Sequence, residues 1–159
     1  MEFNLYNITG KGFIRKRYDV YKANNLVYEC RLKIFLSQIN MYPLDGSPTL
    51  IIKKKFSFLK MNIEIFKGAE LLAVLQPSVK IMGYNINVQT THELLTIEGN
   101  IMASAFVIKR GIEEICKISR KATLSPILGI AIVGDEDQQL ILSIILALEL
   151  FIIVKQAGG

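Results

Sequence analysis

The most apolar stretch of the chain is the C-terminal segment from Gln138 to Val154, which reads QQLILSIILALELFIIV. Its apolar residues neither alternate nor keep to one stripe, so a helix formed from them is apolar on every side. Such a helix has to be buried all round, and the preceding residues must supply the enclosure. We therefore expect a central helix over about residues 138–155.

The preceding residues alternate between apolar and polar with a period of two. Between Tyr28 and Ile34 the apolar residues take the even positions, whereas Glu29, Arg31 and Lys33 take the odd ones. This is typical of a half-buried antiparallel strand, and Asn24-Asn25 just upstream predicts a hairpin turn. Similar stretches recur between turn residues such as Pro77, and residues 41–48 are predicted to be the longest loop. The twelve predicted strands are 3–8, 18–22, 26–35, 50–58, 61–66, 71–76, 79–82, 84–90, 94–98, 101–109, 112–120 and 127–133.

The number of strands matches the need to enclose a helix. An eight-stranded barrel is filled by its own side chains, whereas an eleven-stranded one holds a helix about 10 Å across. We therefore expect a mainly β (α+β) fold, a closed antiparallel β-barrel of about twelve strands enclosing a hydrophobic C-terminal α-helix. At 159 residues the chain fits a single domain, 1–159.

A C-terminal membrane anchor is the rival interpretation of the apolar segment. The run 140–154 would cover about 22 Å as a helix, short of a hydrocarbon layer of about 30 Å. It also contains Glu149, and a central acidic residue costs about 2.5 to 3.5 kcal/mol in a membrane. We therefore favour the buried helix.

The limits of this helix are marked by polar and small residues. Asp135-Glu136-Asp137 is expected to cap its start rather than to form a calcium site, and Ala157-Gly158-Gly159 is expected to end it. Inside a barrel Glu149 must be neutral or paired, either as a structural contact near one mouth or as the polar floor of a ligand pocket.

Composition narrows the classes of chemistry. The net charge of +5 permits anionic partners without demanding them. Cys30 and Cys116 sit in apolar strand patterns, which favours buried inert thiols over a disulfide or a nucleophile. The single His92 has no partner at ligand spacing, so we expect no metal site. With no secretory signal at the N-terminus, a reducing cytoplasmic setting is the default expectation.

Several short motifs, in this order, resemble the LURP-one-related family over residues 18–151. They are GSPTLIIKKKFS (46–57) with EIFKG (64–68), IEGN (97–100) with FVIKRG (106–111) and ICKISRK (115–121), and VGDEDQQ (133–139) followed by the apolar helix and Glu149.

The resemblance implies the tubby C-terminal-like fold, a twelve-stranded barrel threaded by a C-terminal helix, shared with phospholipid scramblases. In one departure, Ser125-Pro126-Ile127 stands where the family carries an acidic and aromatic motif, which leaves any role of that motif in doubt here. Tubby proteins bind phosphoinositide head groups, but their basic residues do not align with this chain, so no binding residue is carried over.

The residues themselves indicate binding rather than catalysis. No nucleophile and base, phosphate loop or HExxH motif is present, so we expect no enzyme, no cofactor and no catalytic residue. The basic runs supply candidate anion- or lipid-binding residues, namely Arg15, Arg17, Lys53 and Lys55. Lys16 and Lys54 alternate in step with apolar neighbours, so they occupy inward-facing positions of their strands. The competing interpretation of the basic runs is a solvated barrel exterior without a ligand.

The expected function is a binding module for an anionic phospholipid head group or a protein partner. The expected location is cytoplasmic, with peripheral attachment to a membrane surface. A basic run without an aromatic platform or a recognition helix gives no reason to expect nucleic acid. The alternative function is a membrane-anchored scramblase-like protein that uses the C-terminal apolar helix.

Overall fold

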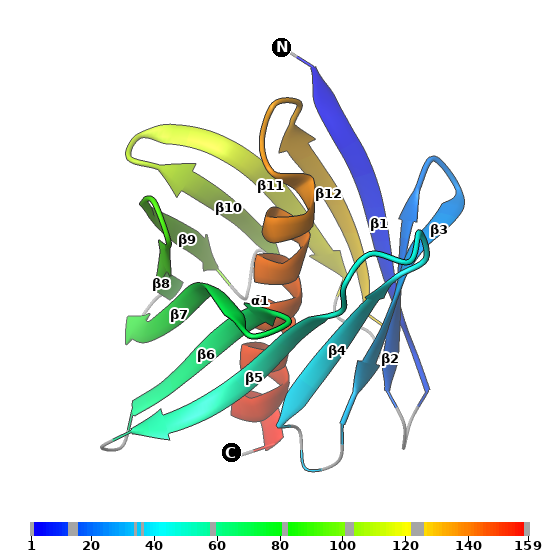
Figure 1. The fold of residues 1–159 in the computed structure, drawn as a ribbon. Coiled ribbons are helices and arrows are strands. Elements are labelled where there is room, and N and C mark those ends of the chain that lie inside the picture. The colour runs from blue at the N-terminus through cyan, green and yellow to red at the C-terminus, as the bar shows by residue number, and fades with distance from the viewer. Residues whose placement is uncertain are drawn as a thin grey trace.

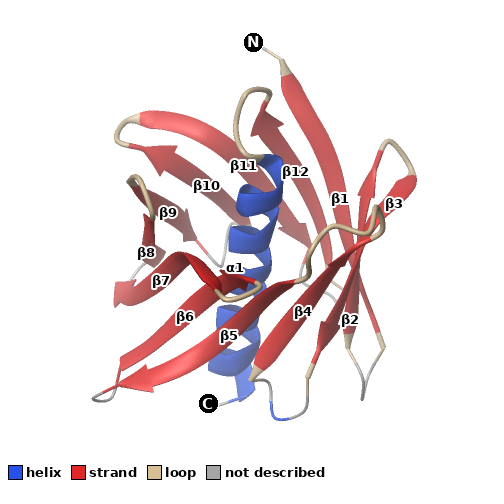
Figure 2. Cartoon of the chain, viewed as in Figure 1, coloured by secondary structure: helices blue, strands red, loops and turns tan. Residues whose placement is uncertain are grey.

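The computed structural model describes residues 2–12, 16–33, 35, 37–57, 60–80, 83–100, 104–121 and 126–157. Twelve antiparallel strands close into a barrel, and one helix, α1 (Gln138–Ala157), runs through its centre (Figures 1 and 2). The strands are β1 (Phe3–Lys11), β2 (Arg17–Lys22), β3 (Asn25–Leu32), β4 (Gln38–Pro43), β5 (Leu50–Ser57), β6 (Lys60–Lys67), β7 (Glu70–Lys80), β8 (Gly83–Thr90), β9 (Leu94–Asn100), β10 (Ala105–Arg110), β11 (Glu113–Lys121) and β12 (Ile127–Val133). The predicted fold class is confirmed.

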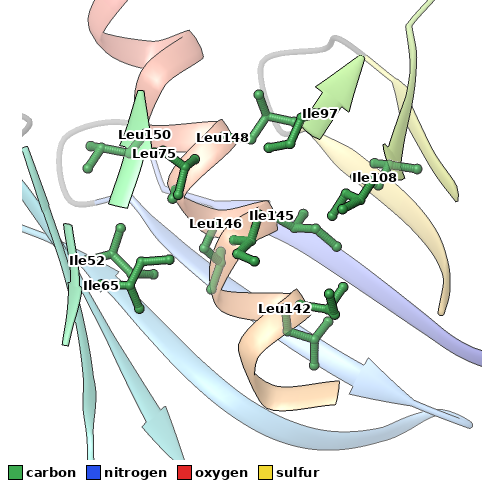
Figure 3. Close-up of a cluster of buried hydrophobic side chains, with 14 of the residues drawn as sticks. Ile52, Ile65, Leu75, Ile97, Ile108, Leu142, Ile145, Leu146, Leu148 and Leu150 are labelled. Carbon is green, nitrogen blue, oxygen red and sulfur yellow. The ribbon is translucent and has the colours of Figure 1, made fainter. Parts of the chain in front are cut away.

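Each strand pairs with its neighbours in the sequence, and β1 closes the barrel by pairing with β12. Because strand side chains alternate between two faces, every second residue points at α1 and the others point at solvent. Large aliphatic side chains from the wall surround those of the helix (Figure 3). The labelled members of this core are Ile52, Ile65, Leu75, Ile97 and Ile108 from the strands and Leu142, Ile145, Leu146, Leu148 and Leu150 from α1.

The strand prediction contains two errors, one strand missed and one strand divided in two, and they cancel in the count. β4 was not predicted, because two prolines and a glycine within 41–48 indicate a loop; the structure continues the strand through Pro43. The predicted break at Pro77 does not occur either. Pro77 pairs with Ile86 of β8 on one side, whereas the pairing of β7 with β6 ends at Leu75. Beyond Leu75 the strand is therefore paired on one side only, where a proline is tolerated.

The first hairpin turns one residue earlier than predicted. Ala23 and Asn24, not Asn24 and Asn25, connect β2 to β3, with φ of 50° and 66°. Positive φ at both central residues is the signature of the twisted turn that matches the twist of the flanking strands.

Polar contacts fasten the start of α1. Asp137 caps it, since the backbone N–H of Leu140 donates to Asp137 Oδ1 at 3.1 Å. Arg110 donates both to Glu136 Oε1, at 2.8 Å, and to Glu93 Oε1, at 2.8 Å. This ties the loop before the helix to β10 and to the connection between β8 and β9. The predicted helix start is confirmed, whereas Gly158 and Gly159, predicted to end the helix, lie outside the described residues.

The antiparallel order sorts the connections between strands onto two ends of the barrel. Odd-numbered strands finish at the end where α1 also finishes, and even-numbered strands finish at the end where α1 begins (Figure 1). Connections that are far apart in the sequence therefore gather at the same end.

Candidate anion-binding surface

The two ends of the barrel carry opposite charges. The difference lies in the charged residues of the connections, each counted with the one strand residue on either side of it. Where α1 finishes, the charged residues that the structure describes are all basic, and we call this the basic end: Lys11, Lys16, Arg17, Lys33, Lys60, Lys80 and Lys121. Where α1 begins, acidic residues predominate, and we call this the acidic end: Asp45, Glu70, Glu93, Glu113, Asp135, Glu136 and Asp137, with the basic Lys22, Lys67 and Arg110.

The structure places three of the four predicted binding residues, and Arg15 lies outside the described residues. Arg17 begins β2 at the basic end, and Lys53 and Lys55 lie on β5 near the same end; all three are exposed. Two strands, β3 and β4, separate β2 from β5, so the two groups are about 14 Å apart across the wall. They share one face without converging on one point, and their role stays a prediction.

Two further cations, which sequence reasoning did not select, bridge this gap. Arg31 of β3 pairs directly with Arg17. Lys33 follows β3, and its backbone N–H donates to the carbonyl of Gln38, which pairs in turn with Lys53. The sequence places Arg31 and Lys33 at polar positions of a predicted strand. Only the pairing of the strands shows that they lie next to Arg17 and near Lys53.

Acidic side chains neutralise part of this surface. Asp19 is almost completely buried, and its Oδ2 accepts from Lys11 Nζ at 2.9 Å and lies 3.7 Å from Arg17 Nη2. Lys55 Nζ lies 4.0 Å from Glu64 Oε2. The basic side chains of these pairs are about half exposed or more, at 48% for Lys11, 54% for Arg17 and 64% for Lys55, so an anion can reach these cations from solvent.

Other cations on the same side have no acidic partner among the described residues. Lys53 lies with its Nζ 5.1 Å from the centre of the Phe66 ring. Within the part of the chain that the structure describes, Lys16, Lys33, Lys60 and Lys121 form no ion pair. These ammonium groups are available to an anionic ligand.

Inside the barrel, close to the basic end, lies a buried ion pair. Arg120 of β11 donates from Nε to Glu149 Oε1 of α1 at 2.5 Å, and the side chains are 10% and 1% exposed. The hydroxyl of Tyr18 is buried beside them and has no hydrogen-bond partner among the residues that the structure describes. Burial and the neighbouring Glu149 carboxylate raise the pKa of Tyr18. Glu149 was predicted to be either neutral or paired, and the structure shows it paired with Arg120.

The surroundings of the two cysteines and of the single histidine do not favour reactivity. Cys30 and Cys116 are both buried and free, and burial raises the pKa of each thiol, that of Cys116 to about 12. A thiol that stays protonated is a poor nucleophile. Within the described residues no three His, Cys, Asp or Glu side chains are grouped to hold a metal ion, and His92 is exposed.

Comparison with known proteins identifies one relationship. The model of the LURP-one-related family matches residues 6–149, nearly the whole barrel and most of α1. No curated protein and no solved structure gives a significant match.

Proposed function

The chain belongs to the LURP-one-related family, and from this premise and the charge distribution of the barrel we propose that it is a non-enzymatic module that binds anionic phospholipid surfaces through its basic end. The family and a barrel closed around an apolar helix fit a binding module. The observation that supports a phospholipid ligand is the separation of charge between the two ends.

The separation matters because electrostatic attraction to a membrane is short-ranged. A helix of 20 residues is about 30 Å long, and α1 extends from the acidic end to the basic end. At physiological ionic strength the Debye length is about 8 Å. The acidic end therefore lies several Debye lengths from a membrane that touches the basic end, and it does not weaken the attraction.

The arrangement of the cations favours a surface over a single small ligand. The basic residues are distributed over the connections around the end of the barrel and over the outer face of β2, β3 and β5. Each lysine or arginine close to an anionic leaflet contributes about 1 kcal/mol. A spread of cations lets several lipid head groups be engaged at once.

The proposed location follows from the ligand. Anionic lipids are concentrated in the cytoplasmic leaflet, where polybasic surfaces are attracted. The two buried free thiols are compatible with a reducing compartment. We propose peripheral attachment to this leaflet from the cytoplasm.

Co-sedimentation with lipid vesicles tests the proposal. The protein should pellet with phosphatidylcholine vesicles that contain phosphatidylserine or phosphoinositides, and not with phosphatidylcholine alone. Lys33→Gln combined with Lys60→Gln removes about 2 kcal/mol of attraction, so binding should weaken roughly thirtyfold. Lys22→Gln, a lysine at the acidic end, is the matched control and should bind as the wild type does. Absence of enrichment on anionic vesicles would remove the phospholipid hypothesis.

The alternative of a membrane-anchored scramblase-like protein requires a different position of α1. Among the described residues this helix alone is long and apolar enough to span a membrane, and 72% of its 18-residue window Gln138–Lys155 is buried inside the barrel. Leaving the barrel would expose the apolar inner wall to water. Purification of a monodisperse protein without detergent is the expected outcome, and a strict need for detergent would favour the anchor instead.

A further inference from the structure

We propose, as an extension that rests on the proposed function, that the basic end inserts aromatic side chains into an anionic bilayer, with Phe35 and Phe56 below the head groups. Binding would then have two parts, an electrostatic one from the cations and a hydrophobic one from these side chains. The barrel would stand on the membrane with its acidic end pointing away.

Phe35 is the most exposed aromatic residue described in the structure. It lies in the connection between β3 and β4, its side chain is 88% exposed, and its φ is +65°. A bulky residue in the left-handed region is unusual and costs conformational energy. A phenyl ring that is exposed to water gains no hydrophobic free energy to offset this cost. The same ring gains such free energy when it is buried at the edge of a bilayer's hydrocarbon.

Phe56 stands at the mouth of the same end. It has the inward parity of Leu50 and Ile52 on β5, yet it is 64% exposed, because the strand has reached the end of the barrel. The ammonium of Lys54 lies 5.2 Å from the centre of its ring. An aromatic ring with a lysine beside it suits the membrane interface, because the ring enters the apolar layer while the ammonium stays among the phosphates.

The sequences of the connections differ between the ends in the same way. The connections at the basic end are rich in large apolar residues in the sequence, and Phe35 is the one that the structure describes. Those at the acidic end contain only Leu44 and Ile112. Among the described residues, exposed apolar side chains occur at both ends, for example Leu44 and Ile112 at the acidic end and Phe35 and Phe56 at the basic end, so the surrounding charge is what distinguishes the basic end.

Charge decides which partner this apolar surface fits. An interface with a second copy would bring two basic ends together, and the connections there carry no acidic residue in the sequence to offset the repulsion. An anionic bilayer satisfies both properties, because its phosphates meet the cations and its hydrocarbon receives the aromatic rings. We therefore assign the surface to a phospholipid bilayer.

A fluorescent probe tests the insertion directly, because the chain contains no tryptophan. Phe35→Trp places the only indole at the basic end, and Ile112→Trp places it at the acidic end, where Ile112 is 99% exposed. Each variant is mixed with phosphatidylcholine–phosphatidylserine vesicles with and without brominated phosphatidylcholine, and the pelleted fraction is measured in parallel. The emission of Phe35→Trp should shift to the blue and be quenched by the bromines, whereas that of Ile112→Trp should do neither.

The results separate this inference from the function on which it rests. If Phe35→Trp pellets with the vesicles but is not quenched, head-group binding stands and insertion is wrong. If it does not pellet with anionic vesicles although the wild type does, the ring at position 35 does not enter lipid as proposed. If the wild type does not pellet either, both proposals fail.

A second measurement does not depend on tryptophan. Phe35→Ser and Phe56→Ser, with all charges kept, should each weaken vesicle binding about tenfold. Leu44→Ser, at an exposed apolar position of the acidic end, should leave binding unchanged. Equal binding by all three variants, each shown to be folded by circular dichroism, would overturn the insertion. So would a Phe35-dependent dimer that does not bind vesicles, because the surface would then join two copies of the chain.

Discussion

The ion pair between Arg120 and Glu149 joins the barrel wall to the helix at a place that is almost free of water. Burying two charges costs several kcal/mol per ion, and only their mutual attraction and hydrogen bonds offset this cost. The alternation of side chains along β11 is enough to place Arg120 on the inner face of the barrel, with Cys116 and Ile118. The partner of Glu149 was nevertheless not predicted, because nothing local connects a strand position with a helix position 29 residues away.

We expect Arg120→Leu to destabilise the protein by about 3 to 5 kcal/mol, because it leaves the Glu149 carboxylate buried and unpaired. The double variant Arg120→Leu with Glu149→Leu should recover most of this loss, since it buries no charge. Urea unfolding at pH 7 gives both values. A double variant no more stable than the single one would mean that the pair contributes packing rather than charge compensation.

The buried thiols lead to a pH prediction. Burial raises the pKa of Cys116 from 9.0 to about 12 in the folded state. Between these values the unfolded chain releases a proton that the folded chain retains, so the free energy of unfolding falls as the pH rises. The loss is about 1.4 kcal/mol per pH unit for one thiol, and it is absent below about pH 9.

Urea unfolding from pH 8 to pH 11 tests this. The stability of the wild type should fall more steeply than that of Cys116→Ala, which starts lower because of its cavity but lacks this titration. Parallel curves for the two proteins would show that the thiol does not titrate differently in the two states.

At the scale of elements, the helix was easier to predict than the strands. A run that is apolar on every side admits few environments, and α1 begins at the predicted residue. The strands depend on turn residues for their limits, and prolines misled the prediction at Pro43 and Pro77. Both prolines are tolerated because a strand interrupted in one ladder can still pair on its other side.

The two strand errors show why the surface could not be predicted. Connections alternate between the two ends of the barrel. Omitting β4 therefore assigns each later connection to the wrong end, until the false break at Pro77 adds one strand and restores the order. The connection between β5 and β6, which brings Lys60 to the basic end, falls in the misassigned interval. The total of twelve strands was right while the placement of this lysine would have been wrong.

The helix core supplies a prediction at this scale. Leu146 is completely buried in the middle of α1. Leu146→Ala should cost about 2 to 5 kcal/mol through the cavity that it leaves, and Leu146→Asp should abolish soluble folded protein, because it adds an unpaired buried charge. Lys155→Ala, at an exposed site near the end of the helix, should cost under about 1 kcal/mol. Soluble yield and circular dichroism give the comparison, and a normally folded Leu146→Asp would contradict the buried helix.

For the whole molecule, wall and helix are one folding unit. The inner wall is lined by large aliphatic side chains, and without α1 it would face a space that its own side chains do not fill. We expect a chain that stops after Asp137 to bind the dye ANS and to lack near-ultraviolet circular dichroism. A chain that stops after Lys155 should fold normally. Native-like spectra from the shorter chain would show that the barrel closes without its helix.

The sequence by itself determined the properties that a local pattern encodes. Period-two alternation determined that the chain is rich in strands, the all-round apolar run determined a buried helix, and ordered motifs pointed to the LURP-one-related family. Exposure of Arg17, Lys53 and Lys55 followed from the same alternation.

Only the tertiary structure decided which distant residues become neighbours. The closure of β1 on β12, the pairing of Arg17 with Arg31, and the contact of Arg120 with Glu149 depend on the register of strands and on the direction of the helix. Periodicity reports which face of a strand is buried, but it carries no information on the end of the barrel to which a connection belongs. The separation of a basic end from an acidic one is therefore a property of the closed barrel.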